Sequence, residues 1–580
     1  MANDTILKNC SAQGETKLNS TFRWRTLVAS LAAVLAALVF FGLIRYRLRE
    51  MPLERDEGDF AYTGQLLLEG IPPYKLAYNL QAPGLYAAYA GILAVFGQTA
   101  AGIHLGLLMV NAATTILLFF LTARLAGRLA GVAGACCYAL LSTSSSVMGF
   151  EAHATNFVVL PALGGIFLLL SALETGTGWA FLASGVFCGI AFLMKQHGAF
   201  FSLFGFLYLV TGRRDRGAMP RLARDAVLFG AGVIFPYACT CWLLYRAGVF
   251  RQFWFWTVSY AAEYSKIGFH RAVRAFLENF GTITKPAIPI WILAAIGLTT
   301  PFWNARARQH ARFLVGLFAC SFLALCPGAY FRRHYFILLL PAVAILAGLA
   351  VVSAAETIEA KTRSKALYRF VAALVLVASF AYPVFQQRHE YFSMPPEEVF
   401  EQIYGQNPFQ PAILVADYVK RNSSPSATIA VVGSEPEIYF YANRHSATGY
   451  LCMYELIVRH KYTAQMRQEM LRELDTNRPE YVVYVDEWSS WGDRNGGAQT
   501  AAFLSALQLF MNSSYERVGV AEIGGAKGHV WGDAARSYVP GSPSAIYVLK
   551  RTQATATSEP TRAPAQEKNA ILVGASASSN

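Results

Sequence analysis

The feature that most constrains this chain is a series of long apolar stretches between residues 26 and 385, separated by short polar segments. A helix needs about twenty apolar residues to cross the hydrocarbon core of a bilayer. Charged residues make up 15% of the sequence, whereas soluble proteins have about 25%. The sequence therefore predicts an all-α polytopic membrane bundle of about eleven helices. The spans are expected at 26–44, 101–122, 130–149, 157–173, 178–194, 198–211, 226–245, 282–302, 312–327, 335–353 and 369–385.

The short loops predict the direction of the bundle, because arginine and lysine are concentrated in loops that share one side in this register. These residues are Arg124 and Arg128, the basic residues of 213–224, Arg306, Arg308 and Arg312, and those of 361–369. Such loops face the cytoplasm. We therefore expect a cytoplasmic leader at 1–25, a first anchor helix rather than a cleaved signal peptide, and an extracytoplasmic C-terminal part. The net charge of +13 belongs to these loops, so no nucleic-acid partner is expected.

Two segments on the outer side, 45–100 and 246–281, are too long for simple connectors. The first contains a short apolar run at 83–97, opened by Pro83. Counting this run as a span would place the basic residues after 122 outside, so we expect a helix that lies at the outer membrane interface. The second segment is rich in aromatic residues, which is typical of a segment at headgroup level.

After residue 386 the pattern changes to that of a soluble domain. Helical periodicity at 409–421, 462–475 and 498–511 alternates with strand-like runs at 428–433, 481–485, 516–523 and 545–550. This alternation predicts a C-terminal extracytoplasmic α/β domain over 386–551. Segment 434–450 directly follows a strand, which is typical of a binding loop and equally compatible with a packed connection. The tail 552–580, rich in Ala, Ser and Thr, is expected to be disordered.

Three carboxylates, Asp56, Glu57 and Asp59, follow the first predicted span. One of them can act as a general base that deprotonates a hydroxyl group in a partly dry cleft. The alternative is a solvated acidic turn that caps a helix starting near Phe60. Spacing alone favours the solvated turn, and both interpretations stay open at this point.

A second group of candidates is basic and lies on the outer side, against the charge trend. Arg332, Arg333 and His334 stand among aromatic residues, and such groups can bind a lipid phosphate or extend to outer headgroups. Lys195 ends an apolar helix on the same side, where it adds positive charge or caps the helix.

A third group, Glu151, His153 and Asn156, lies in the turn between two spans. These side chains suit acceptor or donor contacts, and a plain connecting turn is equally compatible with them. No CxxC pair or His/Cys cluster suggests zinc, so neither a metal nor a cofactor is expected.

The outer loop resembles that of the GT-C superfamily of membrane glycosyltransferases, especially its protein O-mannosyltransferase-like and aminoarabinose-transferase-like bacterial members. The resemblance rests on the pair Asp56-Glu57 in RDEGDFAY, the stretch LLLEGIPPY at 66–74, and the short helix that follows Gln81-Ala82-Pro83. The segment HYFILLLPAVAILAGLA at 334–350 is also similar. The resemblance covers roughly residues 26–385.

This resemblance implies that Asp56 is the catalytic base, with Glu57 beside it in the catalytic pair. It also implies a polyprenyl-phosphate-linked sugar donor and inverting transfer of a hexosyl or pentosyl group outside the cytoplasm of a bacterial inner membrane. The acceptor would be an envelope glycan, lipid or protein. No DxD motif is present, so metal-independent transfer is expected.

The chain departs from the family pattern at two places. Gln81 stands where relatives have lysine, so a phosphate contact is assigned to Lys195 or Arg332 instead. Asn156 stands near the position of a second acidic residue, with Glu151 and His153 close by. We expect Asp59, Gln81 and these three turn residues to contact substrate.

Two other classes of protein stay open. A transporter or flippase for lipid-linked sugars would show internal repeats and broken midplane helices, and the sequence has no evident repeat. A non-catalytic envelope assembly protein would use the C-terminal domain to bind partners. Substitution of Asp56 would leave such a protein working.

Overall fold

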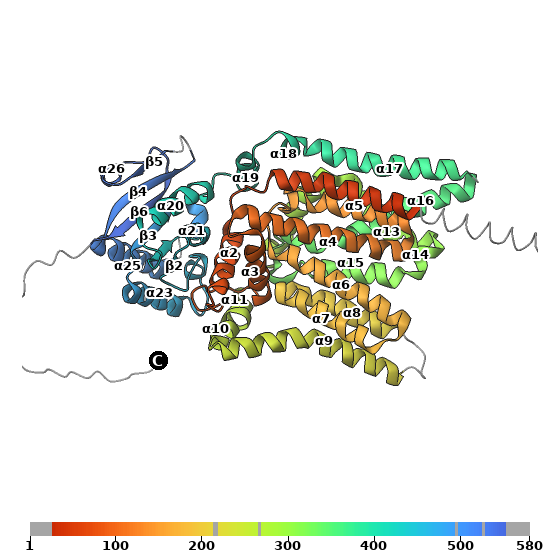
Figure 1. The fold of residues 1–580 in the computed structure, drawn as a ribbon, viewed down its shortest axis with the longest axis horizontal. Coiled ribbons are helices and arrows are strands. Elements are labelled where there is room, and N and C mark those ends of the chain that lie inside the picture. Colours follow the sequence, from red (N-terminus) through yellow and green to blue (C-terminus); the bar gives the residue numbers. More distant parts are fainter. Residues whose placement is uncertain are drawn as a thin grey trace, which may run out of the picture.

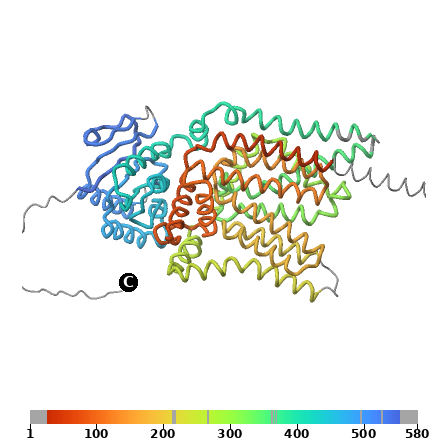
Figure 2. The backbone as a smooth tube through the Cα atoms, in the orientation of Figure 1, coloured from red at the N-terminus to blue at the C-terminus, as the bar shows by residue number. Residues whose placement is uncertain are grey.

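Long helices run side by side through most of the chain, and a mixed sheet stands at one end of them (Figure 1). The computed structural model describes residues 26–212, 219–264, 268–362, 364–492, 497–524 and 528–552. The predicted leader 1–25, residues 213–218 of one basic loop and the tail from 553 onwards lie outside the described residues. Figure 2 shows the path of the backbone from the bundle into the C-terminal domain.

Each predicted span overlaps a helix, although the predicted spans 130–149 and 312–327 extend beyond helices that end at Ser142 and Leu323. Six helices of the described residues are long and apolar enough to cross a membrane, and the others are shorter. The chain is thus a multi-pass membrane protein, and the count of about eleven spans stays a prediction. The helices are Thr26–Arg47, α4 (Ala100–Ala126), α5 (Arg128–Ser142), α6 (Ala154–Thr175), α7 (Gly178–Met194), α8 (Ala199–Gly212), α9 (Met219–Arg246), α12 (Phe269–Thr284) with α13 (Ile288–Trp303), α15 (Ala311–Leu323), α16 (Leu340–Thr362) and α17 (Lys365–Gln386).

Small residues allow close packing within the bundle, as between α7 and α9. A Cβ atom on Gly185 would lie 2.1 Å from the carbonyl oxygen of Phe229, and one on Gly232 would lie 2.2 Å from that of Leu182. Glycine is therefore required at both positions, because small residues let membrane helices approach and gain van der Waals contact.

The predicted basic loops gather at one end of the bundle. Arg124 forms an ion pair with Glu174 at 2.6 Å, and Arg306 forms one with Glu356 at 2.8 Å. The short helix α14 (Ala305–Gln309) lies at the end remote from the C-terminal domain (Figure 1). The structure confirms that the described parts of these loops share one side, and their cytoplasmic location stays a prediction.

Two helices lie across the opposite end of the bundle, between it and the C-terminal domain: α2 (Arg55–Leu68) and α3 (Pro83–Phe96) (Figure 1). Helix α3 confirms the helix expected at 83–97. Helix α2 begins earlier than the expected start near Phe60, because Glu54 caps it and forms a capping box with Glu57. The interpretation of a solvated acidic turn is wrong for Glu57 and Asp59, whose exposed fractions are 0% and 2%.

The segment 246–281 is helical for most of its described length. It contains α10 (Phe250–Trp254), a π-helix η4 (Phe255–Tyr260), α11 (Ala261–Tyr264) and α12, which begins well before the predicted span at 282–302. Phe253, Trp256 and Tyr260 are buried. These three side chains pack inside the protein, since Trp256 stacks on Tyr78 at 5.5 Å and Tyr260 contacts His460 of the C-terminal domain. The location of the segment at headgroup level stays a prediction.

Two short helices, α18 (Arg388–Phe392) and α19 (Pro396–Tyr404), lead into a six-stranded sheet of order β2-β1-β3-β6-β4-β5. β1 lies parallel to β2 and β3, and β6 lies antiparallel to β3 and β4. The predicted α/β fold of this domain is confirmed, and among the strands of the described residues the short β2 and β5 were not predicted. The strands are β1 (Thr428–Val432), β2 (His445–Ser446), β3 (Tyr481–Asp486), β4 (Tyr515–Ile523), β5 (His529–Trp531) and β6 (Ser544–Arg551); the helices expected in this domain are α20 (Phe409–Asn422), α23 (Thr463–Asn477) and α25 (Ala498–Ser514).

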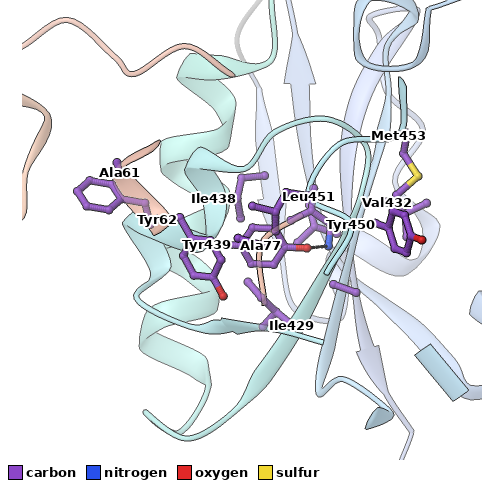
Figure 3. Packing of buried hydrophobic residues seen from close by; sticks show 14 of the residues in the cluster. Ala61, Tyr62, Ala77, Ile429, Val432, Ile438, Tyr439, Tyr450, Leu451 and Met453 are labelled. Atoms are coloured by element: carbon purple, nitrogen blue, oxygen red, sulfur yellow. Dashed lines mark hydrogen bonds between the residues drawn. The ribbon is translucent and has the colours of Figure 1, made fainter. Parts of the chain in front are cut away.

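Segment 434–450 is a packed connection that joins the two parts of the molecule. It contains α21 (Glu437–Ala442), which lies against α2 so closely that a Cβ atom on Gly58 would be 2.5 Å from the backbone nitrogen of Glu437. Tyr62 of α2 stacks on Tyr439 with ring centres 5.2 Å apart, and Figure 3 shows this pair within the shared apolar core. The bundle and the C-terminal domain are therefore joined by a continuous core.

Candidate functional site

A cavity of about 820 Å³ lies between the end of the bundle and the C-terminal domain. Its lining comes from α2, loop 79–81, the turn before α6, the end of α7, segment 330–335 and the region of α22 (Tyr454–Ile457). Most of the predicted site residues meet here, although they are distant in sequence. Those that line the cavity are Asp56, Asp59, Gln81, His153, Lys195, Arg332, Arg333 and His334. Glu57, Glu151 and Asn156 are buried and do not line the cavity, so the expected contact of Glu151 and Asn156 with substrate is not supported.

Asp56 lies in the first turn of α2 and is partly exposed to the cavity. The positive end of the helix dipole stabilises a carboxylate at this position. Within the described ranges, no hydrogen bond to its carboxylate is found, so both oxygens are available to a ligand. Asp56 is therefore the carboxylate of the first turn that can contact a substrate.

Glu57 is held inside the protein. One carboxylate oxygen accepts a hydrogen bond from the backbone N–H of Ala152 at 2.6 Å and lies 3.2 Å from Nε2 of His104. The other accepts from the backbone of Glu54, which in turn accepts from the backbone of Glu57. These bonds join the start of α2 to the turn before α6, so Glu57 orients the helix that carries Asp56.

Asp59 faces loop 79–81. Its carboxylate accepts hydrogen bonds from Asn79 and, at 3.3 Å, from the hydroxyl of Thr63. Asn79 also accepts from the backbone of Gln81 at 3.1 Å. Burial raises the pKa of Asp59 to about 7. The side-chain oxygen of Gln81 is buried without a partner among the described residues, so loop 79–81 presents one unused acceptor to the cavity.

Lys195 and Arg332 give one side of the cavity a positive charge. The ammonium nitrogen of Lys195 lies 4.5 Å from the ring centre of Tyr335, and burial lowers the pKa of this lysine to about 8. Arg332 donates a hydrogen bond to the hydroxyl of Tyr264 at 3.1 Å and lies over the ring of Tyr330. In the part of the chain that the structure describes, neither forms an ion pair with a carboxylate. This pair of cations suits an anionic ligand.

Arg333 has a different environment from Arg332. Its Nε donates to the carbonyl oxygen of Ser146 at 2.9 Å, and Nη2 donates to that of Ser145. These bonds hold the turn η1 (Ser145–Val147) against η7 (Arg333–Leu338). Arg333 lines the cavity, but two of its donors are already used to fix the wall.

His153 and His334 lie face to face, with ring centres 4.1 Å apart and planes inclined by 21°. Both are buried, and burial lowers the pKa of His153 to about 4 and that of His334 well below its usual range. Both imidazoles are therefore neutral at pH 7. Behind them, burial raises the pKa of Glu151 to about 7, and Asn156 donates to the carbonyl oxygen of Glu151 at 3.2 Å.

The C-terminal domain supplies part of the cavity that sequence reasoning missed. Cys452, Tyr454, Glu455 and His460 line it, and burial raises the pKa of Glu455 to about 7. These residues carry no motif, and only the docking of the domain onto α2 brings them to Asp56.

Comparisons with known proteins agree with this architecture. The family model for dolichyl-phosphate-mannose-protein mannosyltransferase matches residues 81–238. A crystal structure of ArnT from Cupriavidus metallidurans bound to undecaprenyl phosphate is 15% identical, with a TM-score of 0.54 over 92% of this chain and 99% of that one. The same protein in the apo state is 14% identical, with a TM-score of 0.54 over 90% and 98%. A weaker likeness, 12% identical with a TM-score of 0.47 over 85% and 74%, is to the apo oligosaccharyltransferase of Archaeoglobus fulgidus.

No curated protein matches the sequence significantly. The matches to the mannosyltransferase family model and to ArnT confirm the resemblance to the GT-C superfamily of membrane glycosyltransferases. At identities of 15% and less, this likeness is one of fold.

Proposed function

We propose that this protein is a membrane glycosyltransferase that moves a sugar from a polyprenyl-phosphate-linked donor to an acceptor outside the cytoplasm. One observation carries the proposal: Asp56 shares a cavity with Lys195 and Arg332, two cations without an acidic partner among the described residues. A base opposite an anion-binding side is the arrangement that glycosyl transfer from a phosphate requires. The fold supports it, because ArnT with the same architecture binds undecaprenyl phosphate.

The donor phosphate binds between Lys195 and Arg332. Charge-assisted hydrogen bonds from these groups are stronger than neutral ones. Tyr335 contacts Lys195 and Tyr264 contacts Arg332, and these contacts restrict the motion of the two cations. Arg333 uses two of its donors to hold the turn at 145–147 in place, so its guanidinium is not fully available to bind the phosphate. His334 adds a neutral donor at the same wall.

In the proposed reaction, a hydroxyl of the acceptor attacks the anomeric carbon of the sugar while Asp56 takes its proton. The bond from that carbon to the phosphate oxygen breaks, and the lipid phosphate leaves with the electron pair. Lys195 and Arg332 stabilise the negative charge that develops on the leaving group. Attack from the face opposite the phosphate inverts the anomeric configuration.

The basic end of the bundle faces the cytoplasm of a bacterial inner membrane, because loops rich in arginine and lysine stay inside. The cavity and the domain at 386–551 then lie on the outer side, where an envelope glycan, lipid or protein is the acceptor. A transport function is less compatible with this geometry, since transporters bind substrate near the bilayer midplane and this cavity lies at one end of the bundle.

The proposal is tested with purified protein and lipid-linked sugars extracted from the native membrane. Wild-type protein should release polyprenyl phosphate in the presence of an envelope acceptor extract, and Asp56→Asn should bind the lipid donor but release almost none. If Asp56→Asn turns over at the wild-type rate, the proposed role of Asp56 is wrong. Mass spectrometry of envelope glycans from a deletion strain then identifies the sugar and the acceptor.

A further inference from the structure

One polar group of the cavity has no role in the proposed transfer. Tyr404, the last residue of α19, lines the cavity, and its hydroxyl is buried without a hydrogen bond to any described residue. Buried polar atoms in native proteins are nearly always bonded. The unused hydroxyl therefore points to a ligand that enters the cavity and supplies the missing bond.

The ring of Tyr404 is held by two aromatic neighbours. Phe400 lies one turn earlier in α19 with ring centres 4.7 Å apart, and Phe409, at the start of α20, lies at 5.7 Å with planes inclined by 77°. Both phenylalanines are buried, and aromatic pairs in such arrangements are favourable. Packing thus fixes the body of the side chain and leaves its hydroxyl end for a polar contact.

The backbone of Tyr404 is tied to the C-terminal domain. Its carbonyl oxygen accepts a hydrogen bond from Asn407, and the side-chain oxygen of Asn407 accepts one from the hydroxyl of Ser489 at 3.4 Å. The carbonyl oxygen of Ser489 accepts from the hydroxyl of Tyr454, which itself accepts from Arg55 at 2.9 Å. These bonds connect α19 to the first residue of α2, so the contacts that place the proposed base also place Tyr404.

Tyr404 and the proposed phosphate site lie toward different edges of the cavity. Arg332 donates to Tyr264, the last residue of α11. Helices α11 and α19 stand at opposite edges of the junction between the bundle and the C-terminal domain, with α2 between them (Figure 1). Inverting attack brings the acceptor to the sugar from the face opposite the leaving group. The side of the cavity formed by α19 is therefore the side from which the acceptor reaches Asp56.

The charges near the hydroxyl of Tyr404 are negative. Burial raises the pKa of Tyr404 well above its usual range, and Glu151, Glu54, Glu57 and Asp56 act in the same direction. The hydroxyl therefore keeps its proton and can donate it to a hydrogen bond. A neutral hydrogen-bond donor near the proposed base suits an oxygen atom of the acceptor, next to the hydroxyl that attacks.

We propose that Tyr404 binds the acceptor by donating a hydrogen bond from its hydroxyl to an oxygen atom of the acceptor. This inference rests on the proposed sugar transfer and goes beyond it, because it assigns the acceptor to the side of the cavity formed by α19. The lipid phosphate is bound by Lys195 and Arg332, away from this side. Tyr404 therefore affects the use of the acceptor and leaves the use of the sugar donor unchanged.

The test compares Tyr404→Phe with the wild type in the release of polyprenyl phosphate from lipid-linked sugars of the native membrane. Envelope extract is the acceptor probe. It is titrated at saturating sugar donor, and the sugar donor is titrated at saturating extract. Tyr404→Phe should raise the half-saturating amount of extract by about 3–10-fold, which corresponds to the loss of one neutral hydrogen bond. KM for the sugar donor should stay unchanged.

Tyr391→Phe is the matched control. Tyr391, in α18, is also buried with a hydroxyl that has no partner among the described residues, but it does not line the cavity. This variant should use the extract like the wild type. Thermal melts should show no loss of stability in either variant, because each substitution removes a buried hydroxyl without a partner.

Two results would overturn the inference: equal dependence on extract in the Tyr404 and Tyr391 variants, or an equal rise in KM for the sugar donor in Tyr404→Phe. Neither result affects the comparison of the wild type with Asp56→Asn, which tests the proposed function. If the wild type itself transfers no sugar, the proposed function is wrong and the role of Tyr404 fails with it. The two failures are thus distinguishable.

Discussion

Arg55 donates a hydrogen bond to the carboxylate of Glu435 at 3.1 Å, and this ion pair joins the first residue of α2 to the C-terminal domain. The same guanidinium also donates to the carbonyl oxygen of Ser434 and, at 2.9 Å, to the hydroxyl of Tyr454. Glu435 is fully buried. Because Asp56 follows Arg55 directly, the C-terminal domain helps to set the position of the proposed base.

Glu435→Gln should therefore lower both stability and turnover. Removing one charge from a buried pair leaves the other uncompensated and costs about 3–5 kcal/mol. Thermal unfolding and transfer assays measure the two effects. Arg536→Gln, which breaks the exposed ion pair with Glu516 in the same domain, should change stability by less than about 1 kcal/mol. Equal behaviour of the two variants would show that the Arg55 pair does not hold the domains.

Asp56→Asn should lower kcat by about 10²–10⁴-fold, since asparagine keeps the shape of the side chain but cannot accept a proton. Glu57→Gln and Asp59→Asn should reduce it less, because these carboxylates hold other parts of the site rather than reach the acceptor. Initial rates on purified protein, with binding of the lipid donor measured in parallel, distinguish the three. A kcat of Glu57→Gln below that of Asp56→Asn would move the base to another residue.

Arg332→Ala should raise KM for the lipid donor by about 10–100-fold, which corresponds to the loss of a hydrogen bond to a charged group worth about 1.5–3 kcal/mol. Arg333→Ala should instead lower the melting temperature, because it frees the carbonyl oxygens of Ser145 and Ser146. Donor titrations and thermal melts separate these effects. If KM is unchanged in Arg332→Ala and in the double variant, neither arginine binds the donor phosphate.

Donor use should weaken as pH rises through about 8, where Lys195 loses its proton. Burial lowers the pKa of this lysine, so its charge is present below that pH and lost above it. The pH profile of kcat/KM for the donor reports groups of the free enzyme and should fall on its alkaline side. Lys195→Arg keeps the charge at all these pH values and should remove that fall. An unchanged alkaline limb in Lys195→Arg would assign it to another group.

The direction of the bundle is tested with reporter fusions. A reporter after residue 390 should be active outside the cytoplasm, and one in the loop at 213–218 should be active inside, because arginine-rich loops stay inside. If both report the same side, the number of spans is wrong and the outer location of the cavity fails with it.

Much of the architecture follows from local sequence properties. Runs of about twenty apolar residues predict the bundle helices without knowledge of their neighbours, and the charge pattern predicted α3 as a helix outside the spans, which agrees with its place across the end of the bundle. Short apolar, strand-like runs likewise predicted β1, β3, β4 and β6. The strands β2 and β5, with two and three residues, are too short to show a period.

The site itself was only partly predictable from the sequence. The carboxylates of 56–59 and the basic residues of 332–334 stand out as polar groups beside apolar spans, so their approximate place was evident. Their roles depend on contacts between distant segments: Glu57 bonds to Ala152, and Arg333 bonds to Ser145 and Ser146. The sequence could not distinguish Arg332 from Arg333. The fold decides which of the two guanidinium groups donates its hydrogen bonds to backbone carbonyl oxygens and which one faces a ligand.

The sequence by itself determined that this chain is a membrane bundle with an α/β domain and a carboxylate pair after the first span, since hydropathy, charge and periodicity are properties of neighbouring residues. Only the tertiary structure decided that Arg55 meets Glu435, that His153 stacks on His334, and that Asp56 lines a cavity between the bundle and the C-terminal domain. These pairings join segments far apart in the chain, so they depend on tertiary packing. Arg55 meets Glu435 because burying the shared apolar core of α2 and α21 brings their polar neighbours together.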